Sequence, residues 1–184
     1  MGIRNSVLLF IFISLCSCTR HNNVEKVIER LVGKEIVLPV SLKPYIKNTE
    51  VAIPDFHHNK VKIVVYLDSL GCEDCKLYDL LKMDRLLESH SIFCDEFVVL
   101  YILHPSSHLS KNVGGMLEVI DFNYPVFIDF NGDFEKENPF LPSRNLFHSF
   151  LLNRENKIIL VGSPLNNTKM WDLYNRQIQK ILKK

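Results

Sequence analysis

The sequence predicts an α/β domain in which helices flank a central mixed sheet. The first observation is a set of apolar runs with the length and the Val and Ile content of buried strands, at residues 61–67, 97–103 and 126–130. The second is that segments with helical spacing of apolar side chains lie between these runs, at residues 72–88 and 107–122. The third is the end of the chain, where a predicted β-hairpin precedes an amphipathic helix.

The connections between these elements predict the topology. Strands separated by helices join through right-handed crossovers, so we expect the first three strands to be parallel. The hairpin, with strands at residues 146–152 and 157–161, adds an antiparallel edge, and the helix at residues 168–182 closes the domain. Upstream of the sheet we expect a short helix at residues 24–32 and a short strand at residues 36–40. Two proline-containing segments are predicted to be loops: residues 42–59 and 135–145.

Composition and charge narrow the class of protein. The chain has 184 residues with 22 basic and 21 acidic side chains, which gives a formal net charge of +1. Nucleic-acid-binding proteins usually carry a basic excess or a basic stripe, so we expect no nucleic-acid partner. Because 47% of the residues are hydrophobic, the chain can form a core and is not a disordered protein. Five cysteines are too few for a small disulfide scaffold, so their positions matter more than their number.

The N-terminus has the order of a bacterial export signal. An apolar run at residues 7–15 follows a short start and is too short to span a bilayer as a helix. Residues 15–18 have the sequence LCSC and resemble the bacterial lipoprotein box. In that box Cys18 carries the lipid, and Cys16 leaves with the signal peptide. The alternative is an uncleaved N-terminal anchor.

The lipoprotein interpretation divides the chain into three parts. We expect a signal peptide at residues 1–17, a tether with a short helix at residues 18–35, and the folded domain at residues 36–184. Cys18 then anchors the protein to a lipid membrane of the bacterial cell envelope, facing the periplasm or the cell exterior. Disulfides persist in these compartments, whereas they are rare in the cytoplasm.

A C-x-x-C motif, Cys72-Glu73-Asp74-Cys75, lies between the first buried strand and the helix predicted after it. Two intervening residues bring both sulfurs to one helical turn, close enough to form a disulfide. The free amides and the partial positive charge of a helix N-terminus stabilise a thiolate. Cys72 is therefore the expected nucleophile and Cys75 the resolving thiol. The alternatives are half of a zinc site, which needs two further ligands, a structural disulfide, and a pair of inert thiols.

Over roughly residues 36–182 the sequence resembles the thioredoxin superfamily, in particular the TlpA-like extracytoplasmic thiol–disulfide oxidoreductases. The resemblance rests on the strand–C-x-x-C–helix unit, on residues 124–129 (YPVFID) and on residues 150–158 (FLLNRENKI). It implies a thioredoxin-like fold with the C-x-x-C at the edge of the sheet. It also implies exchange with the disulfides or thiols of client proteins and an upstream redox partner. No organic cofactor and no metal are expected, because the electrons travel through the dithiol itself.

The sequence departs from this family beside the first cysteine. The family usually has an aromatic residue there, whereas Leu70 and Gly71 precede Cys72. The two residues between the cysteines, Glu73 and Asp74, are both acidic. Carboxylates beside a thiolate raise the thiol pKa and destabilise the reduced form. We therefore expect a reductant rather than a strong oxidant.

A second departure concerns the proline that thioredoxin-like proteins place in a cis peptide opposite the C-x-x-C. If residues 150–152 form the first strand of the hairpin, this position falls at Phe147, followed by His148. Another register makes Pro125 the cis-proline but leaves the hairpin unassigned, so we favour the first. On that register Phe147 or His148 faces the cysteines, where a histidine stabilises a thiolate or binds a metal. The alternation of side chains along a strand does not decide whether His148 points inward.

Two competing functions follow from these departures. A non-catalytic thioredoxin-like binding module would use the C-x-x-C as a structural disulfide. A metal-binding lipoprotein would use Cys72, Cys75 and His148 as ligands. Cys94, at the start of the second strand, is expected to be a small buried side chain, with a third redox thiol or an intermolecular link as the alternatives.

Overall fold

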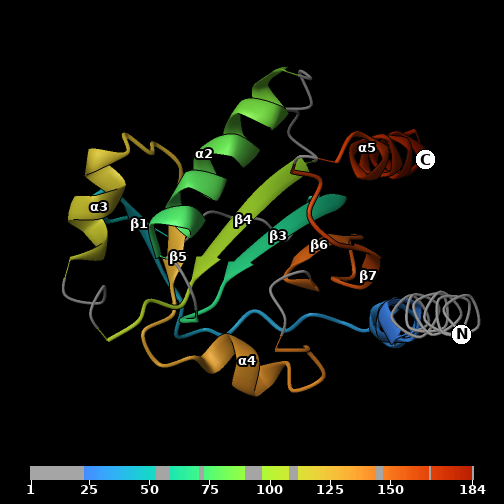
Figure 1. The fold of residues 1–184 in the computed structure, drawn as a ribbon, viewed down its shortest axis with the longest axis horizontal. Coiled ribbons are helices and arrows are strands. Elements are labelled where there is room, and N and C mark those ends of the chain that lie inside the picture. The colour runs from blue at the N-terminus through green and yellow to red at the C-terminus, as the bar shows by residue number, and fades with distance from the viewer. Residues whose placement is uncertain are drawn as a thin grey trace, which may run out of the picture.

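In the part of the chain that the structure describes, the centre is a seven-stranded mixed sheet with the strand order β2-β1-β5-β4-β3-β6-β7. Helices lie on both faces of this sheet, as Figure 1 shows. The predicted fold class, an α/β domain with a central mixed sheet flanked by helices, is confirmed. The computed structural model describes residues 23–52, 59–70, 73–89, 97–107, 112–143, 147–165 and 167–183.

Three parallel strands form the middle of the sheet: β3 (Val61–Leu67), β4 (Phe97–Leu103) and β5 (Val126–Ile128). β4 pairs in parallel with both of its neighbours, as the crossover argument predicted. Every residue of β3 is buried, which explains its nearly continuous apolar sequence. β6 (Ser149–Leu152) and β7 (Ile158–Val161) form the predicted hairpin, and β6 pairs with β3 in antiparallel orientation.

The longer helices follow the predicted pattern. α2 (Glu73–Ser89) follows β3, α3 (Val113–Val119) precedes β5, and α5 (Thr168–Leu182) follows the hairpin. α5 begins where the sequence predicted, because the side chain of Asn167 accepts the Met170 N–H and caps the helix. α3 ends at Val119, before the end of its predicted range at residue 122, and residues 108–111 of that range lie outside the described residues.

The segment upstream of β3 differs from the loop predicted at residues 42–59. It contains a hairpin of β1 (Lys43–Ile46) and β2 (Thr49–Glu50), and β1 pairs with β5 in antiparallel orientation. Pro44 argued for a loop, but its missing N–H removes no bond between β1 and β5. In an antiparallel strand the N–H and C=O of one residue point to the same side, and the Pro44 carbonyl accepts the Val51 N–H, away from β5.

Residues 36–40, predicted to form a strand, instead cross the sheet as an extended segment without strand pairing. The side chain of Asn138 explains this difference. Its Oδ1 accepts the Val37 N–H over 2.9 Å, and its Nδ2 donates to the Val37 carbonyl over 2.8 Å. These are the backbone groups that a partner strand would otherwise use.

A short helix, α4 (Asp133–Glu137), overlaps the start of the segment predicted as a loop at residues 135–145. The carboxylate of Asp129 accepts the N–H groups of Asp133 and Phe134, each over 2.9 Å. These two bonds satisfy amides that have no partner inside the helix, and they start α4 directly after β5.

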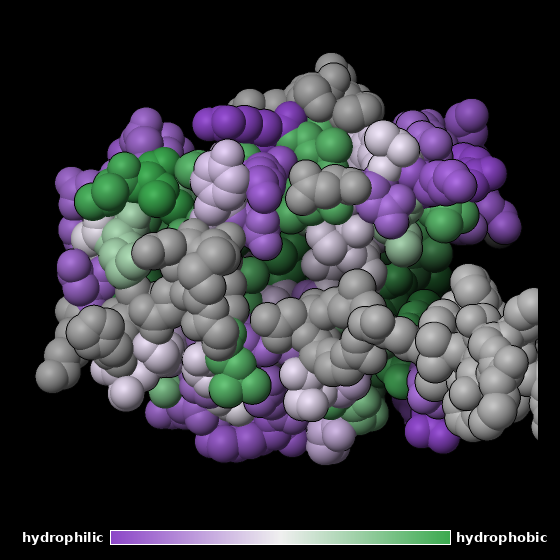
Figure 2. Space-filling view, in the orientation of Figure 1, coloured by the Kyte–Doolittle hydropathy of each residue, from purple (hydrophilic) through white to green (hydrophobic). Residues whose placement is uncertain are grey.

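The two faces of the sheet have different covers. α2, α3 and α5 pack on one face, over a core that includes Leu80, Leu117 and Ile178. A helix at residues 23–31, the extended segment at residues 33–42 and the short α4 cover the other face. In the space-filling view, hydrophilic side chains cover the outer side of α5 at the upper right (Figure 2). Among the described residues, the face without α2, α3 and α5 is covered by short helices and an extended segment, so its cover is thinner.

Candidate active site

The carboxyl ends of the three parallel strands bring polar side chains to one edge of the sheet, here called the carboxyl edge. Asp68 follows β3, His104 follows β4, and Asp129 follows β5. The His104 N–H donates to the Leu67 carbonyl over 2.8 Å. The Asp129 N–H donates to the Leu103 carbonyl over the same distance, so the strand pairing continues into this edge. Open α/β sheets place their ligands and catalytic groups at such an edge.

The C-x-x-C motif belongs to this edge, because it lies in the connection from β3 to α2. The Asp68 Oδ1 accepts the Leu70 N–H over 3.0 Å and thereby fixes the turn that leads out of β3. Cys72 lies outside the described residues, and the residue after it, Glu73, is the first of α2. The backbone of Cys75 therefore lies in the first turn of α2, where amides and the helix dipole favour negative charge.

Buried side chains hold α2 against the sheet. They repeat at the three- and four-residue spacing of one helix face: Leu77, Leu80, Met83 and Leu87. Tyr78 lies on the outer face and is exposed. Packing from Leu77 to Leu87 thus holds α2 against the sheet.

Phe147 and His148 precede β6 and lie beside the carboxyl end of β3. The Tyr66 N–H donates to the His148 carbonyl over 2.9 Å, one step beyond the last residues that β3 and β6 pair. This is the register in which Phe147 takes the position of the family's cis-proline. Both side chains are buried, so His148 does not point into solvent. That one of them faces the cysteines stays a prediction.

The imidazole of His148 is held from two sides. Nε2 lies 2.7 Å from the Pro142 carbonyl oxygen, and because a carbonyl only accepts, Nε2 carries a proton and donates it. Nδ1 lies 3.5 Å from the Asp68 Oδ2, and each of these two side chains is only 3% exposed. The Tyr66 ring packs beside the imidazole, with 5.2 Å between the ring centroids. Asp68 therefore contacts both the turn that follows β3 and the residue directly before β6.

Tyr66 is a further buried polar side chain at the carboxyl edge. Burial, followed by the carboxylates of Glu135, Asp129 and Asp68, raises the pKa of its phenol above the ordinary value. The phenol therefore keeps its proton at neutral pH and remains a hydrogen-bond donor. Its ring also packs against Phe134 of α4, with the centroids 4.8 Å apart.

Pro125, the alternative cis-proline, lies elsewhere. It precedes β5, and since β5 is parallel to β4 and β3, its amino end lies at the edge opposite the carboxyl edge. No cis peptide bond occurs among the described residues. The structure thus brings Phe147 and His148, but not Pro125, to the carboxyl edge of the sheet.

Within the described ranges, no group of three His, Cys, Asp or Glu side chains could hold a metal ion. No helix in the same ranges is long and apolar enough to cross a membrane. Cys16, Cys18 and Cys94 lie outside the described residues. The signal peptide, the lipid attachment and the role of Cys94 therefore stay predictions.

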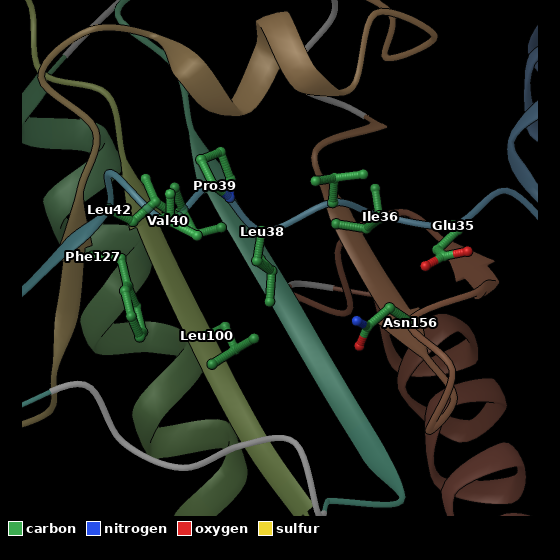
Figure 3. Close-up of a pocket in the computed structure, with 11 residues that line it drawn as sticks. Glu35, Ile36, Leu38, Pro39, Val40, Leu42, Leu100, Phe127 and Asn156 are labelled. Atoms are coloured by element: carbon green, nitrogen blue, oxygen red, sulfur yellow. The ribbon is translucent and has the colours of Figure 1, made fainter.

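A cavity of about 320 Å³ lies on the face opposite α2, between the extended segment and the sheet (Figure 3). Its walls are mostly apolar and include Leu38 of the segment, Leu100 of β4 and Phe127 of β5. Glu35 and Asn156 lie at one end of it, as Figure 3 shows. The thin cover of this face leaves the space, and its composition suits an apolar group.

The sequence pattern did not single out Asp68 or Tyr66. A signal for Asp68 exists, because it is an acidic residue directly after an apolar strand and just before the C-x-x-C. Tyr66 gives no such signal, since a tyrosine in a buried strand is usually a core residue.

No family model and no curated protein matches the sequence. Solved structures do match it. The thioredoxin domain of a thiol-disulfide oxidoreductase from Bacteroides vulgatus is 16% identical, with a TM-score of 0.51 over 82% of this chain and 97% of that chain. An uncharacterized thioredoxin-like protein from Porphyromonas gingivalis is 18% identical, with a TM-score of 0.50 over 79% of this chain and 92% of that chain. StoA from Bacillus subtilis is 18% identical, with a TM-score of 0.50 over 76% of this chain and 98% of that chain. The fold is therefore thioredoxin-like, and thiol–disulfide oxidoreductases are among its distant structural neighbours.

Proposed function

We propose that this protein is a membrane-tethered thiol–disulfide oxidoreductase that acts on the disulfides of other proteins in the bacterial cell envelope. The observation that carries this proposal is the position of the sequence Cys72-Glu73-Asp74-Cys75. It falls between the carboxyl end of β3 and the first turn of α2, in a thioredoxin-like sheet. Thiol exchange uses a dithiol at a helix N-terminus, because the thiolate is stabilised there.

The reaction needs no group beyond the two sulfurs. In the reductive direction the Cys72 thiolate attacks one sulfur of a client disulfide, and the other client sulfur leaves as a thiolate. The Cys75 thiolate then attacks the Cys72 sulfur, which releases the second client thiol and closes a Cys72–Cys75 disulfide. The client gains two electrons, and the dithiol loses two. An upstream dithiol partner returns two electrons to the protein for the next cycle.

Reduction of insulin disulfides tests this activity. With a small dithiol as the electron source, we expect the wild-type protein to accelerate the reduction and Cys72→Ser to abolish it. Cys75→Ser should accumulate the mixed disulfide, because the resolving thiol is missing. Cys94→Ser is the matched control and should keep the activity. A wild-type protein that gives no acceleration overturns the proposal.

The proposed tether is a lipid on Cys18. Growth of the producing bacterium with a radioactive fatty acid should label the wild-type protein and the Cys16→Ser variant. Cys18→Ser should lose both the label and the association with the membrane fraction. A Cys18→Ser variant that keeps the label contradicts this part of the proposal.

A binding module without catalysis is the second candidate. Two departures from the family favour it: Leu70 and Gly71 precede Cys72 where the family usually has an aromatic residue, and Phe147 falls at the position of the family's proline. This candidate predicts that client binding survives in Cys72→Ser and that the wild-type protein reduces no insulin. The metal-binding alternative predicts stoichiometric metal in anaerobically purified wild-type protein and its loss in Cys72→Ser.

A further inference from the structure

The cavity between the extended segment and the sheet lies on the face opposite α2 and is not explained by thiol exchange. We propose that this cavity binds a neutral amphiphile, namely a linear aliphatic chain that ends in a hydroxyl group. The apolar walls contact the chain, and the side chain of Asn156 accepts a hydrogen bond from the hydroxyl. This inference goes beyond the proposed function and does not depend on it.

The cavity exists because the backbone of the extended segment is bonded to groups other than the strands beneath it. The Ile36 N–H donates to the Asn156 carbonyl over 2.9 Å. The side chain of Asn138 pairs with both backbone groups of Val37. A paired strand lies about 4.8 Å from its neighbour in the same layer. The extended segment instead crosses over the sheet as a second layer, as Figure 3 shows, and the side chains between the two leave about 320 Å³ open.

The cavity is elongated in the direction across the strands. Figure 3 shows Phe127 at one end and Asn156 at the other, with Leu38 between them. Phe127 belongs to β5, Asn156 lies between β6 and β7, and β5 and β6 are three places apart in the sheet. With about 4.8 Å between neighbouring strands, the two ends are roughly 14 Å apart. A linear chain fits this shape better than a compact ring.

The walls of the cavity are apolar on both sides. The sheet contributes Leu100, Ile102 and Phe127, and the extended segment contributes Leu38 and Pro39. The three sheet residues are each at most 5% exposed, so water reaches little of their surface. Apolar cavities hold no well-ordered water, and moving an aliphatic chain from water into such a space is favourable. The volume and the lining are those of a small-molecule site.

One end of the cavity has a buried acceptor. The Oδ1 of Asn156 is buried and forms no hydrogen bond within the described ranges. The backbone of Asn156 fixes its position, because its N–H donates to the Asn153 carbonyl over 3.1 Å and its carbonyl accepts the Ile36 N–H. In Figure 3 the amide points from the turn toward Leu38. A buried acceptor without a donor is unfavourable, so a ligand that brings an O–H to this end gains a hydrogen bond there.

The charges at the same end select an uncharged head group. Glu35 also lines the cavity there, and it pairs with Lys157 in an antiparallel bridge. Residues that pair in this way have their side chains on the same face, so a carboxylate and an ammonium group lie side by side. Neither sign of charge prevails. A hydroxyl, which donates without carrying a charge, therefore fits this end better than a carboxylate or an ammonium group.

Isothermal titration calorimetry of the full chain with hexanol, octanol and decanol tests the binding. We expect one saturable site with a Kd that falls about fourfold for each added methylene group. Methyl nonyl ether has the atoms of decanol but no O–H, and it should bind about tenfold more weakly. Decanoate should also bind more weakly than decanol. No saturable binding of decanol overturns the proposal, and tighter binding of the ether or of decanoate overturns the assigned head group.

Two variants test the two parts of the site. Asn156→Gly removes the acceptor, and glycine adopts the φ of 58° found at this position without strain. This variant should bind decanol and the ether equally. Leu38→Trp fills the cavity with an indole ring and should lose saturable binding. Val119→Trp is the matched control and should bind as the wild type does, because Val119 is 86% exposed on α3, on the other face of the sheet.

Methyl NMR locates the ligand independently of its affinity. Decanol should shift the methyl resonances of Leu38 and Leu100 and leave those of Leu80, in the core beneath α2, unchanged. Shifts at Leu80 without shifts at Leu38 and Leu100 overturn the assignment to this cavity. Saturable binding that persists in Leu38→Trp overturns it as well, and an Asn156→Gly protein that still prefers decanol to the ether overturns the role of Asn156.

Discussion

Replacing Tyr174 with phenylalanine removes one hydroxyl group from the core and tests how α5 is fixed to the sheet. Tyr174 is 0% exposed, and its hydroxyl donates to the Gly162 carbonyl, at the end of β7, over 2.8 Å. The variant keeps the ring and its packing, so the change in stability comes from this bond. A net hydrogen bond contributes about 1 kcal/mol, and leaving its buried acceptor unpaired costs about 1–3 kcal/mol. We therefore expect Tyr174→Phe to lower the free energy of unfolding by about 2 kcal/mol.

Urea unfolding followed by far-ultraviolet circular dichroism measures this loss. With a slope of about 2 kcal/mol per molar urea, the midpoint should move down by about 1 M, and the slope should not change. Tyr78→Phe is the matched control, because Tyr78 is 54% exposed on α2. It should change stability by less than about 0.5 kcal/mol. Equal effects of the two substitutions would refute the reasoning.

Three further predictions concern pH, the extended segment and the C-x-x-C. Burial raises the pKa of Tyr66 and of Tyr101 above the ordinary 10.0, so the unfolded state ionises first and stability falls as pH rises above about 10. Urea unfolding on both sides of that pH measures this, and constant stability contradicts it. Asn138→Ala removes the three hydrogen bonds of a buried amide and should lower the free energy of unfolding by about 3 kcal/mol. Urea unfolding measures this change as well, and a loss below about 1 kcal/mol would be too small for three hydrogen bonds. Replacing Glu73 and Asp74 by Gln and Asn should make the dithiol less reducing in glutathione buffers, because two carboxylates no longer oppose the thiolate. A potential that stays the same or becomes more reducing argues against this.

The sequence predicted the middle of the sheet well because its signals are local. β3 is a run of apolar residues bounded by polar ones, and both of its faces are buried in the structure. The predicted hairpin and α5 are correct for the same reason, since strand pattern, turn residues and capping residue lie close together in the chain. These elements also fixed the register that places Phe147 and His148 beside β3.

The parts of the structure that the sequence did not predict depend on contacts between residues that are far apart in the chain. β1 exists because its backbone pairs with β5, although Pro44 by itself favours a loop. Residues 36–40 are not a strand, because Asn138, about a hundred residues later, occupies the backbone of Val37. The approach of Asp68 to His148 joins two segments that are far apart in the chain, and no local pattern in either one indicates it.

The measurement that tests the central claim most directly is a redox titration of the full chain in glutathione buffers. The thiols are trapped and counted by mass spectrometry at each ratio of reduced to oxidised glutathione. We predict a single two-electron transition that belongs to Cys72 and Cys75, at a potential more negative than about −180 mV, and its loss in Cys72→Ser. A transition as oxidising as that of DsbA, at about −120 mV, would contradict the predicted role as a reductant. A chain in which Cys72 and Cys75 show no shared transition would contradict the account as a whole.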